Sequence, residues 1–271
     1  MSGSDWIPPD VDLSRPNAAR IYDYYLGGAH NFAIDREFAR RALEAFPDAR
    51  AGSWLNRQFL GRTVRFCLNQ GIRQFLDIGS GIPTVGHTHE IAQTSAPEAK
   101  VVYVDNEAVA FAHSQLILAD NPNATTLRAD ARRPKDILFA DETRSMLDFD
   151  QPIALLMLTL LHFIANRENP LALLAEYRDA VTPGSYLVLS HVSADLHPTE
   201  MNQFAALYED TNNPVTLRTR AEFAELFDGW ELIEPGVSQL AFWNPSDADP
   251  PLPIGWEFAN ETGYGAVAIK R

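Results

Sequence analysis

The chain has 271 residues, of which 46% are hydrophobic and 21% are charged, and its formal net charge at pH 7 is −14. This composition favours one large globular domain, and the acidic balance argues against a nucleic-acid substrate because phosphate backbones repel such a protein. The single cysteine, Cys67, excludes an intrachain disulfide and a cysteine zinc cluster. The longest apolar run, residues 153–164, is too short to span a bilayer, so we expect no membrane association and a cytoplasmic location.

The N-terminal part predicts an arm and then a helix. Residues 1–16 are rich in Asp, Pro and Ser, which is typical of a mobile arm. Residues 17–28 predict a helix that Asn17 caps and that Gly27 and Gly28 end. Its three tyrosines within four positions cannot all share one buried face, so some should face a cleft, a partner or solvent.

Two more helices are predicted, at residues 35–46 and 53–70. The second carries three arginines that we expect on its solvent-facing side: Arg57, Arg62 and Arg65. We therefore expect residues 1–70 to form an arm and a helical lid, and residues 71–271 to form the core of one compact domain.

From residue 71 onward, short apolar segments alternate with helical ones. The predicted strands are residues 75–78, 101–104, 125–129, 153–158, 186–190, 230–233 and 264–269. This alternation predicts the α/β class, with a doubly wound and mostly parallel sheet. No helix is predicted between the last two strands, so we expect them to close the sheet as an antiparallel pair.

A glycine turn joins the first strand to a helix predicted at residues 84–94. Its sequence is Phe75-Leu76-Asp77-Ile78-Gly79-Ser80-Gly81-Ile82-Pro83. Strand, glycine turn and helix form the opening unit of nucleotide-binding α/β domains, and glycines let the backbone approach a ligand closely. The turn alone is weak evidence, because ordinary strand-to-helix connections also use glycine.

Acidic residues stand at the ends of three predicted strands: Asp77, Asp105 and Asp130. Asp105 can accept hydrogen bonds from both hydroxyls of a ribose, and Asp130, followed by Ala131, can accept one from an adenine amino group. Asp77 can meet a cationic group or orient the glycine loop. Any one of them can instead cap a helix, but three in register with the turn favour a ligand site.

The turn departs from the dinucleotide fingerprint, because Thr84 stands at its third glycine position. The chain also lacks the Gly-x-x-x-x-Gly-Lys-Ser/Thr motif that binds nucleoside triphosphates. A nucleoside ligand without phosphates fits better, and S-adenosylmethionine is the obvious one.

Several motifs resemble those of class I S-adenosylmethionine-dependent methyltransferases. They are Leu76-Asp77-Ile78-Gly79-Ser80-Gly81, Val104-Asp105-Asn106 and Arg128-Ala129-Asp130-Ala131-Arg132. More narrowly, the chain resembles an actinobacterial S-adenosyl methyltransferase family that was formerly a domain of unknown function. That likeness rests on residues 16–28, Asn31-Phe32, Asp35-Arg36, residues 74–84, residues 102–106 and Leu161-His162-Phe163.

The resemblance implies a Rossmann-like methyltransferase sheet and S-adenosylmethionine as cofactor, and it says little about the substrate. The cofactor-binding residues that we predict are Arg20, Tyr22, Tyr25, Gly28, Asp77, Gly79, Ser80, Gly81, Asp105, Asn106, Asp130, Ala131 and Thr159. In this prediction the N-terminal helix folds over the cofactor as a lid. Arg20 reaches the methionine carboxylate, Tyr22 and Tyr25 wall the site, and Gly28 allows close approach. The alternative is that this helix only covers the sheet.

We expect the methyl acceptor beyond the end of the fourth strand, near residues 158–162. His162 is the candidate general base there and His191 is a second candidate, although loop groups can instead satisfy either ring. The segment lacks the Asn/Asp-Pro-Pro-aromatic signature of enzymes that methylate base amines, and the chain has no Pro-Cys nucleophile. Four aromatic residues near the Pro-rich loop either form an apolar acceptor pocket or pack the last strands: Phe242, Trp243, Trp256 and Phe258.

His87 and His89 suggest a metal site at first sight, but within a helix they would point to different sides, so no metal is predicted. The sequence therefore predicts methyl transfer from S-adenosylmethionine to a small-molecule acceptor. The alternatives are a non-catalytic S-adenosylmethionine-binding regulator and an NAD-dependent oxidoreductase. The oligomeric state, monomer or homodimer, stays open.

Overall fold

The computed structural model describes residues 11–83, 86–247 and 249–271, and its centre is an eight-stranded sheet. The strands are β1 (Gln74–Ile78), β2 (Lys100–Asp105), β3 (Ala124–Arg128), β4 (Ala154–Leu158), β5 (Tyr186–Val192), β6 (Glu231–Leu232), β7 (Ser238–Gln239) and β8 (Gly263–Ile269). They lie in the order β3-β2-β1-β4-β5-β8-β6, and β7 pairs with β8.

The first five strands are parallel to their neighbours, whereas β8 runs antiparallel to β5, from Tyr186 opposite Ile269 to Val192 opposite Gly263. The predicted α/β class, with a mostly parallel sheet and an antiparallel last strand, is confirmed. The chain builds the sheet outward from β1 in one direction and then restarts at β4 in the other. Open sheets of this kind bind ligands at the carboxyl ends of the strands, where the order reverses.

Helices cover both faces of the sheet and one of its ends. They are α1 (Ala18–Tyr25), α2 (Ala33–Ala45), α3 (Ala49–Asn69), α4 (Thr88–Ser95), α5 (Ala108–Leu118), α6 (Pro134–Leu138), α7 (Asp141–Met146), α8 (Pro170–Ala180), α9 (Pro198–Leu207), α10 (Arg220–Glu225) and α11 (Glu257–Glu261). Successive strand residues point to opposite faces. Phe75 packs into the cluster that α3 and α4 cover, and Leu76 packs into the cluster that α8 and α10 cover.

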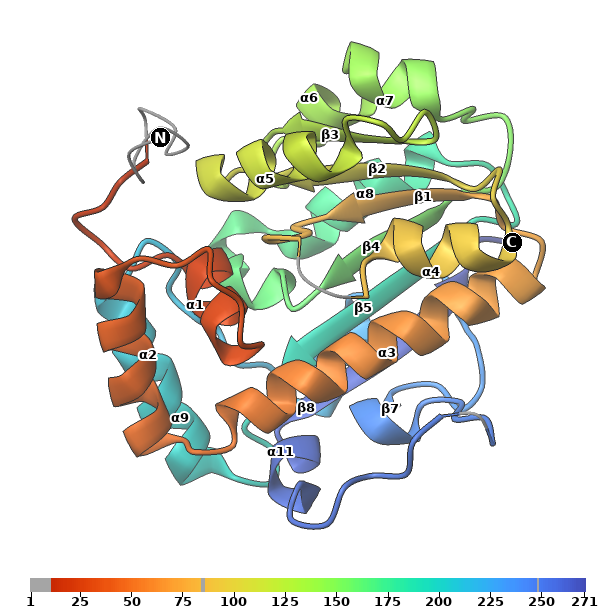
Figure 1. Ribbon diagram of the computed structural model, residues 1–271. Coiled ribbons are helices and arrows are strands. Elements are labelled where there is room, and N and C mark those ends of the chain that lie inside the picture. Colours follow the sequence, from red (N-terminus) through yellow and green to blue (C-terminus); the bar gives the residue numbers. More distant parts are fainter. Residues whose placement is uncertain (1–10, 84–85, 248) are drawn as a thin grey trace.

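A lid of three helices lies beyond the carboxyl ends of the strands, where α1, α2 and α9 stand together (Figure 1). Ile21 of α1, Phe38 of α2 and Phe204 of α9 share its apolar cluster. The lid therefore differs from the one predicted from residues 1–70. It includes α9, from far later in the chain, and it excludes α3, whose Leu55 and Phe59 are fully buried against the sheet.

Two expectations about local structure are refined. β6 and β8 form the expected antiparallel pair, with Glu231 opposite Ile269, but they are not consecutive elements, because β7 and α11 lie between them in the chain. A five-residue helix such as α11 is too short to leave a periodic pattern in the sequence. The helix predicted at residues 84–94 begins only at Thr88, since the Glu90 carboxylate accepts the backbone N–H groups of Gly86 and His87 at 2.8 and 3.0 Å. Residues 84–85 lie outside the described part of the chain.

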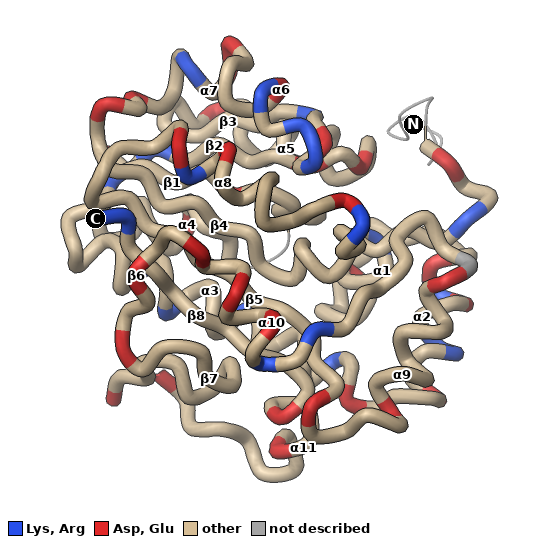
Figure 2. Tube along the Cα trace, turned by 180° about the vertical axis from the view of Figure 1, so that it is seen from behind, with Lys and Arg blue, Asp and Glu red and all other residues tan. Residues whose placement is uncertain are grey.

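The N-terminal arm is described only from residue 11, so most of the segment predicted to be mobile lies outside the described residues. Arg20 donates to the backbone carbonyls of Asp12 and Arg15, which ties residues 12–15 to α1. Among the described residues, no helix is long and apolar enough to cross a membrane. Seen from behind, the lysine and arginine positions are interspersed with acidic ones (Figure 2).

Candidate functional site

A cavity of about 220 Å³ lies between the lid and the carboxyl ends of the strands. Its floor is formed by the glycine turn after β1 and by the segments that follow β2, β3, β4 and β5. Its walls come from α1, the first half of α3 and α9. The fold thus places an enclosed space at the end of the sheet where such folds bind their ligands.

The glycine turn is shaped by contacts that exclude side chains. Gly79 and Gly81 have φ angles of +71° and +69°, and the N–H groups of Gly79 and Ser80 both donate to the carbonyl of Val104. A Cβ on Gly79 would stand 2.6 Å from Leu160 Cδ1. Glycine is therefore required for the turn itself and for its close approach to the segment after β4.

The structure brings the three predicted strand-end carboxylates together, since Asp77, Asp105 and Asp130 all line the cavity. Asp105 accepts from Gly81 N at 2.8 Å and from Glu107 N at 2.9 Å, which holds its carboxylate in a fixed orientation. A carboxylate has about four acceptor sites, so Asp105 can still accept further hydrogen bonds from a ligand. Asp130 accepts from Arg132 N at 2.9 Å.

The Asp77 carboxylate lies in a buried environment that shifts its pKa. It accepts a hydrogen bond from Thr88 Oγ1 at 2.7 Å and is nearly inaccessible to solvent. Burial raises the pKa of Asp77 to about 6, against the opposing effects of Thr88 and the nearby Arg57 guanidinium. A carboxylate in this environment gains strongly from a cationic ligand.

Other predicted residues line the same cavity: Tyr22, Tyr25, Asn106, Ala131 and Thr159. Tyr22 donates to the carbonyl of Ser53 and accepts from Asn56 Nδ2, each at 3.0 Å. Asn56 Oδ1 accepts in turn from Ser190 Oγ at 2.6 Å, and Ser190 Oγ accepts from Thr159 N at 2.9 Å. Thr159 has a φ angle of +49°, which is a strained conformation for a β-branched residue.

Two predicted residues, Arg20 and Gly28, do not line the cavity. Arg20 is buried with its guanidinium 2.9 Å from Asp35 and 3.2 Å from Glu107, so it is committed to carboxylates of the protein. At Gly28, a Cβ would stand 2.0 Å from Asp23 Oδ1, which explains this glycine by packing inside the lid. The prediction that Arg20 reaches a ligand carboxylate is therefore corrected.

Arg57 is an arginine that does line the cavity. It was predicted on the solvent side of α3, but it lines the cavity close to Asp77. Its Nε is buried and has no hydrogen-bond partner, and its guanidinium carbon lies 6.0 Å from the centre of the Tyr22 ring. Four cavity-lining residues of α3 have the spacing of one helical face: Ser53, Asn56, Arg57 and Leu60. This face is largely polar, and its pattern in the sequence could have indicated that α3 lines the site.

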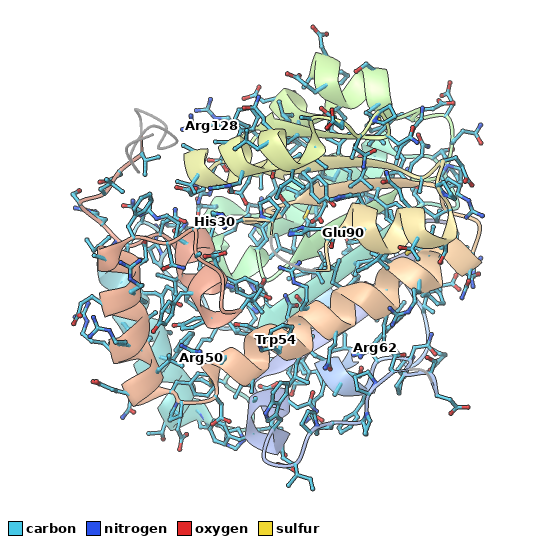
Figure 3. All side chains as sticks on the ribbon, in the orientation of Figure 1. His30, Arg50, Trp54, Arg62, Glu90 and Arg128 are labelled. Carbon is cyan, nitrogen blue, oxygen red and sulfur yellow. The ribbon has the colours of Figure 1, made fainter. Side chains whose placement is uncertain are left out.

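The other two arginines of α3, Arg62 and Arg65, differ in their burial. Arg62 points from α3 toward the segment around β7 (Figure 3), where its buried guanidinium donates to the backbone carbonyls of Leu240 and Trp243. Arg65 is half exposed and pairs with Asp249 at 2.5 Å. Of the three arginines, only Arg65 meets the expectation of a solvent-facing side chain.

The two candidate bases, His162 and His191, line the cavity but have different surroundings. His191 lies 2.7 Å from the carbonyl of Val192 through Nδ1 and 2.8 Å from Arg218 Nη1 through Nε2. Because the carbonyl can only accept and the guanidinium can only donate, Nδ1 carries the proton and Nε2 accepts. Both nitrogens of His191 are thus used, whereas Nδ1 of His162 is buried without a partner.

The remaining candidates lie outside the cavity. His87 precedes α4, His89 lies in its first turn, and their rings stack with centres 6.3 Å apart. No cluster of metal-ligating side chains is found among the residues that the structure describes. Of the four aromatic residues near the Pro-rich loop, Trp243 packs the fold, fully buried against Phe59 and Phe66, whereas Phe242 is exposed.

The profile of the S-adenosyl methyltransferase family matches residues 4–271. The chain belongs to this family. Its methyl donor is accordingly S-adenosylmethionine, and the family resemblance stated from the sequence motifs is confirmed. No curated protein sequence matches the chain.

Solved structures of two similar proteins extend over almost the whole chain. A DUF574 family protein from Streptomyces avermitilis MA-4680 is 38% identical, with a TM-score of 0.90 over 96% of this chain and 99% of that one. A protein from Thermobifida fusca YX, proposed to be a methyltransferase, is 37% identical, with a TM-score of 0.91 over 99% and 100% of the two chains.

A more distant structure shares the fold alone. Magnesium protoporphyrin IX methyltransferase from Synechocystis PCC 6803, solved with bound S-adenosylhomocysteine, is 14% identical, with a TM-score of 0.55 over 93% of each chain. The Rossmann-like methyltransferase sheet predicted from the sequence is thereby confirmed.

Proposed function

We propose that the cavity binds S-adenosylmethionine with its amino-acid end between Arg57 and Asp77. The observation that carries this placement is the Arg57 guanidinium, whose Nε has no hydrogen-bond partner, close to the buried Asp77 carboxylate. A zwitterionic amino acid presents one carboxylate and one ammonium group, which match this pair of opposite charges. A dinucleotide offers no such zwitterion, so the pair also argues against an oxidoreductase.

The other residues of the site fit the rest of the ligand. Asp105 is oriented by two backbone N–H groups and keeps acceptor capacity for the ribose hydroxyls. Asp130 and Ala131, which follow β3 and line the cavity, are suited to the adenine edge. Gly79 and Gly81 keep the floor free of side chains.

We further propose that the acceptor is a small molecule. The cavity is covered by the lid, which leaves little room for a macromolecular substrate, and the net charge of −14 disfavours nucleic acid. When bound, S-adenosylmethionine supplies an electrophilic methyl group on a sulfonium. The contribution of the protein is to orient the two reactants and to exclude water.

Calorimetric titration of the purified protein with S-adenosylmethionine, S-adenosylhomocysteine and NAD tests the cofactor assignment. We expect the two adenosyl ligands to bind with one site per chain and NAD not to bind. Tight binding of NAD, with no binding of either adenosyl ligand, would refute the proposed site.

A further inference from the structure

The cavity continues past the proposed cofactor position into a compartment beneath the lid, and this inference rests on the proposed function. Its lining is apolar, with Phe46 after α2, Met201 and Phe204 from α9, and Phe163, Val215 and Leu240 from loops. An apolar compartment of this kind favours an acceptor with an apolar body.

The charges around the cavity are placed away from that compartment. In the described part of the chain, the cationic side chains that line the cavity are Arg57 and Arg132. Arg57 is assigned to the cofactor, and Arg132 lies within 3.3 Å of Asp130 and within 3.2 Å of Glu168. The lining carboxylates all belong to the cofactor half as well. An acceptor with a full charge would therefore be desolvated without a counter-ion, which is costly.

One polar group in the wall of the apolar compartment lacks a partner. Nδ1 of His162 is buried and makes no hydrogen bond, whereas the hydroxyl of Tyr25 shares a hydrogen bond with Tyr208. Buried polar groups are nearly always paired in folded proteins, so an unpaired group in a cavity wall indicates where a ligand presents a polar atom. The ring of His162 therefore suits a ligand that offers a hydrogen-bond donor there.

His162 is held in a neutral, proton-accepting state by its neighbours. Its ring centre lies 5.6 Å from that of His191, which Arg218 of the loop before α10 contacts at 2.8 Å. Arg218 is itself fixed by the carbonyls of Leu161 and Ile164 at 2.8 Å each. Burial, His191 and Arg218 all hold the pKa of His162 well below its usual range.

We propose that the acceptor is an uncharged, largely apolar molecule that is methylated on a hydroxyl oxygen, with His162 as the general base. The hydroxyl proton goes to His162, the oxygen forms a bond to the methyl carbon, and the methyl–sulfur bond breaks with its electron pair left on sulfur. The products are the methyl ether, S-adenosylhomocysteine and a proton, which His162 passes to solvent. A weakly basic imidazole matches an acidic hydroxyl, such as a phenol or an enol, better than an aliphatic alcohol.

A matched set of naphthalene probes tests this proposal: 1-naphthol, 1-naphthylamine and 1-naphthoate. Their binding is measured by calorimetry on the protein saturated with S-adenosylhomocysteine, and their turnover with S-adenosylmethionine is followed by mass spectrometry. We expect 1-naphthol to bind at least about tenfold more tightly than 1-naphthoate, because only the latter buries an unpaired charge, and to yield its methyl ether.

Two variants separate a catalytic role from a structural one. His162→Gln should lower kcat for 1-naphthol by about 100-fold or more while its KM and the affinity for S-adenosylhomocysteine change little. The matched control is His197→Gln, since His197 precedes α9 and contacts Glu261 outside the cavity, and it should leave both constants unchanged.

The outcomes distinguish this inference from the function on which it rests. If S-adenosylhomocysteine does not bind, the proposed function itself fails. If it binds but 1-naphthol does not, or if the amine or the carboxylate is methylated in preference, the hydroxyl acceptor is refuted. A His162→Gln variant with undiminished kcat for 1-naphthol would refute the general base.

Discussion

At the scale of single residues, the neighbours of a charged side chain decide whether it is available to a ligand in the cavity. Arg20 and Arg57 are both arginines of the N-terminal region, yet Arg20 is neutralised by Asp35 and Glu107 while Arg57 faces the cavity. The sequence motif around Arg20 led to the prediction that Arg20 binds the cofactor carboxylate. Nothing in that motif reveals that two acidic partners, one of them far along the chain, occupy its guanidinium.

Arg57→Met should weaken the binding of S-adenosylhomocysteine by about 10- to 100-fold, the loss expected for one charge-assisted pair. The free energy of unfolding should change little, because the Arg57 side chain is only partly buried and its Nε makes no hydrogen bond in the ligand-free protein. Calorimetry and urea unfolding measure the two effects. The control is Arg65→Met, on the same helix but outside the cavity, and equal affinity losses in both variants would contradict the assignment.

Asp105→Ala should likewise weaken S-adenosylhomocysteine binding about 10- to 100-fold, since the ribose hydroxyls lose their acceptor. Asp120→Ala, at an exposed position after α5, is the matched control and should not change the affinity. Because Asp105 also accepts from Gly81 and Glu107, a melting curve of the variant must accompany the titration. A folded variant with unchanged affinity would refute the ribose assignment.

Affinity should also depend on pH through Asp77, whose pKa is raised to about 6 by burial. Above that value Asp77 is ionised and attracts the ligand ammonium group, whereas at lower pH a proton occupies it, so affinity should fall about tenfold from pH 7 to pH 5. Arg57, Thr88 and Asp105 also act on this carboxyl group. Calorimetry at both pH values measures the drop, and Asp77→Asn should remove it; a variant with the same pH dependence as the wild type would contradict this origin.

The same shift has a consequence for stability. The pKa of Asp77 in the folded protein lies above the ordinary value of 3.8. Asp77 therefore contributes favourably to the free energy of unfolding below pH 3.8, and this contribution is lost as the pH rises through about 6. At pH 7 the buried carboxylate therefore destabilises the ligand-free protein. Asp77→Asn should raise the free energy of unfolding at pH 7 by roughly 1–3 kcal/mol in urea titrations, and a loss of stability would contradict the buried, ionised state.

At the scale of elements, the lid is fixed to the core through Arg20, which joins α1 to Asp35 of α2 and to Glu107 at the start of α5. Arg20→Met would leave two buried carboxylates without a cation and should cost about 3–5 kcal/mol of unfolding free energy. Urea unfolding measures this loss. The control is Arg40→Met, which breaks an exposed pair with Glu37 and should cost less than about 1 kcal/mol; similar losses would contradict a structural role for Arg20.

Element boundaries were predictable where a side chain marks them. Asn17 accepts from Ala19 N, Asn169 accepts from Ala172 N, and Thr219 and Glu222 cap each other, as their sequence patterns indicate. The short helices α6, α7 and α11 were missed, because five or six residues carry too little periodicity to be recognised.

At the scale of the whole molecule, the sheet was more predictable than the cavity above it. Alternating strands and helices determine a parallel sheet with few permitted connections, and the strand-end carboxylates follow from it. The acceptor compartment instead depends on contacts between α2 and α9, such as Phe46 against Phe204 with ring centres 5.3 Å apart. These segments are distant in the sequence, and no local pattern predicts that they meet.

The central claim is that one cavity holds the adenosyl cofactor between the strand ends and Arg57, with an apolar acceptor compartment beyond it. A crystal structure of the protein with S-adenosylhomocysteine tests this most directly. We expect the ribose at Asp105, the ligand carboxylate at Arg57, and the sulfur facing the compartment that contains His162. A ligand bound outside the cavity, or one whose carboxylate is held by Arg20 with Arg57 turned away, would contradict it.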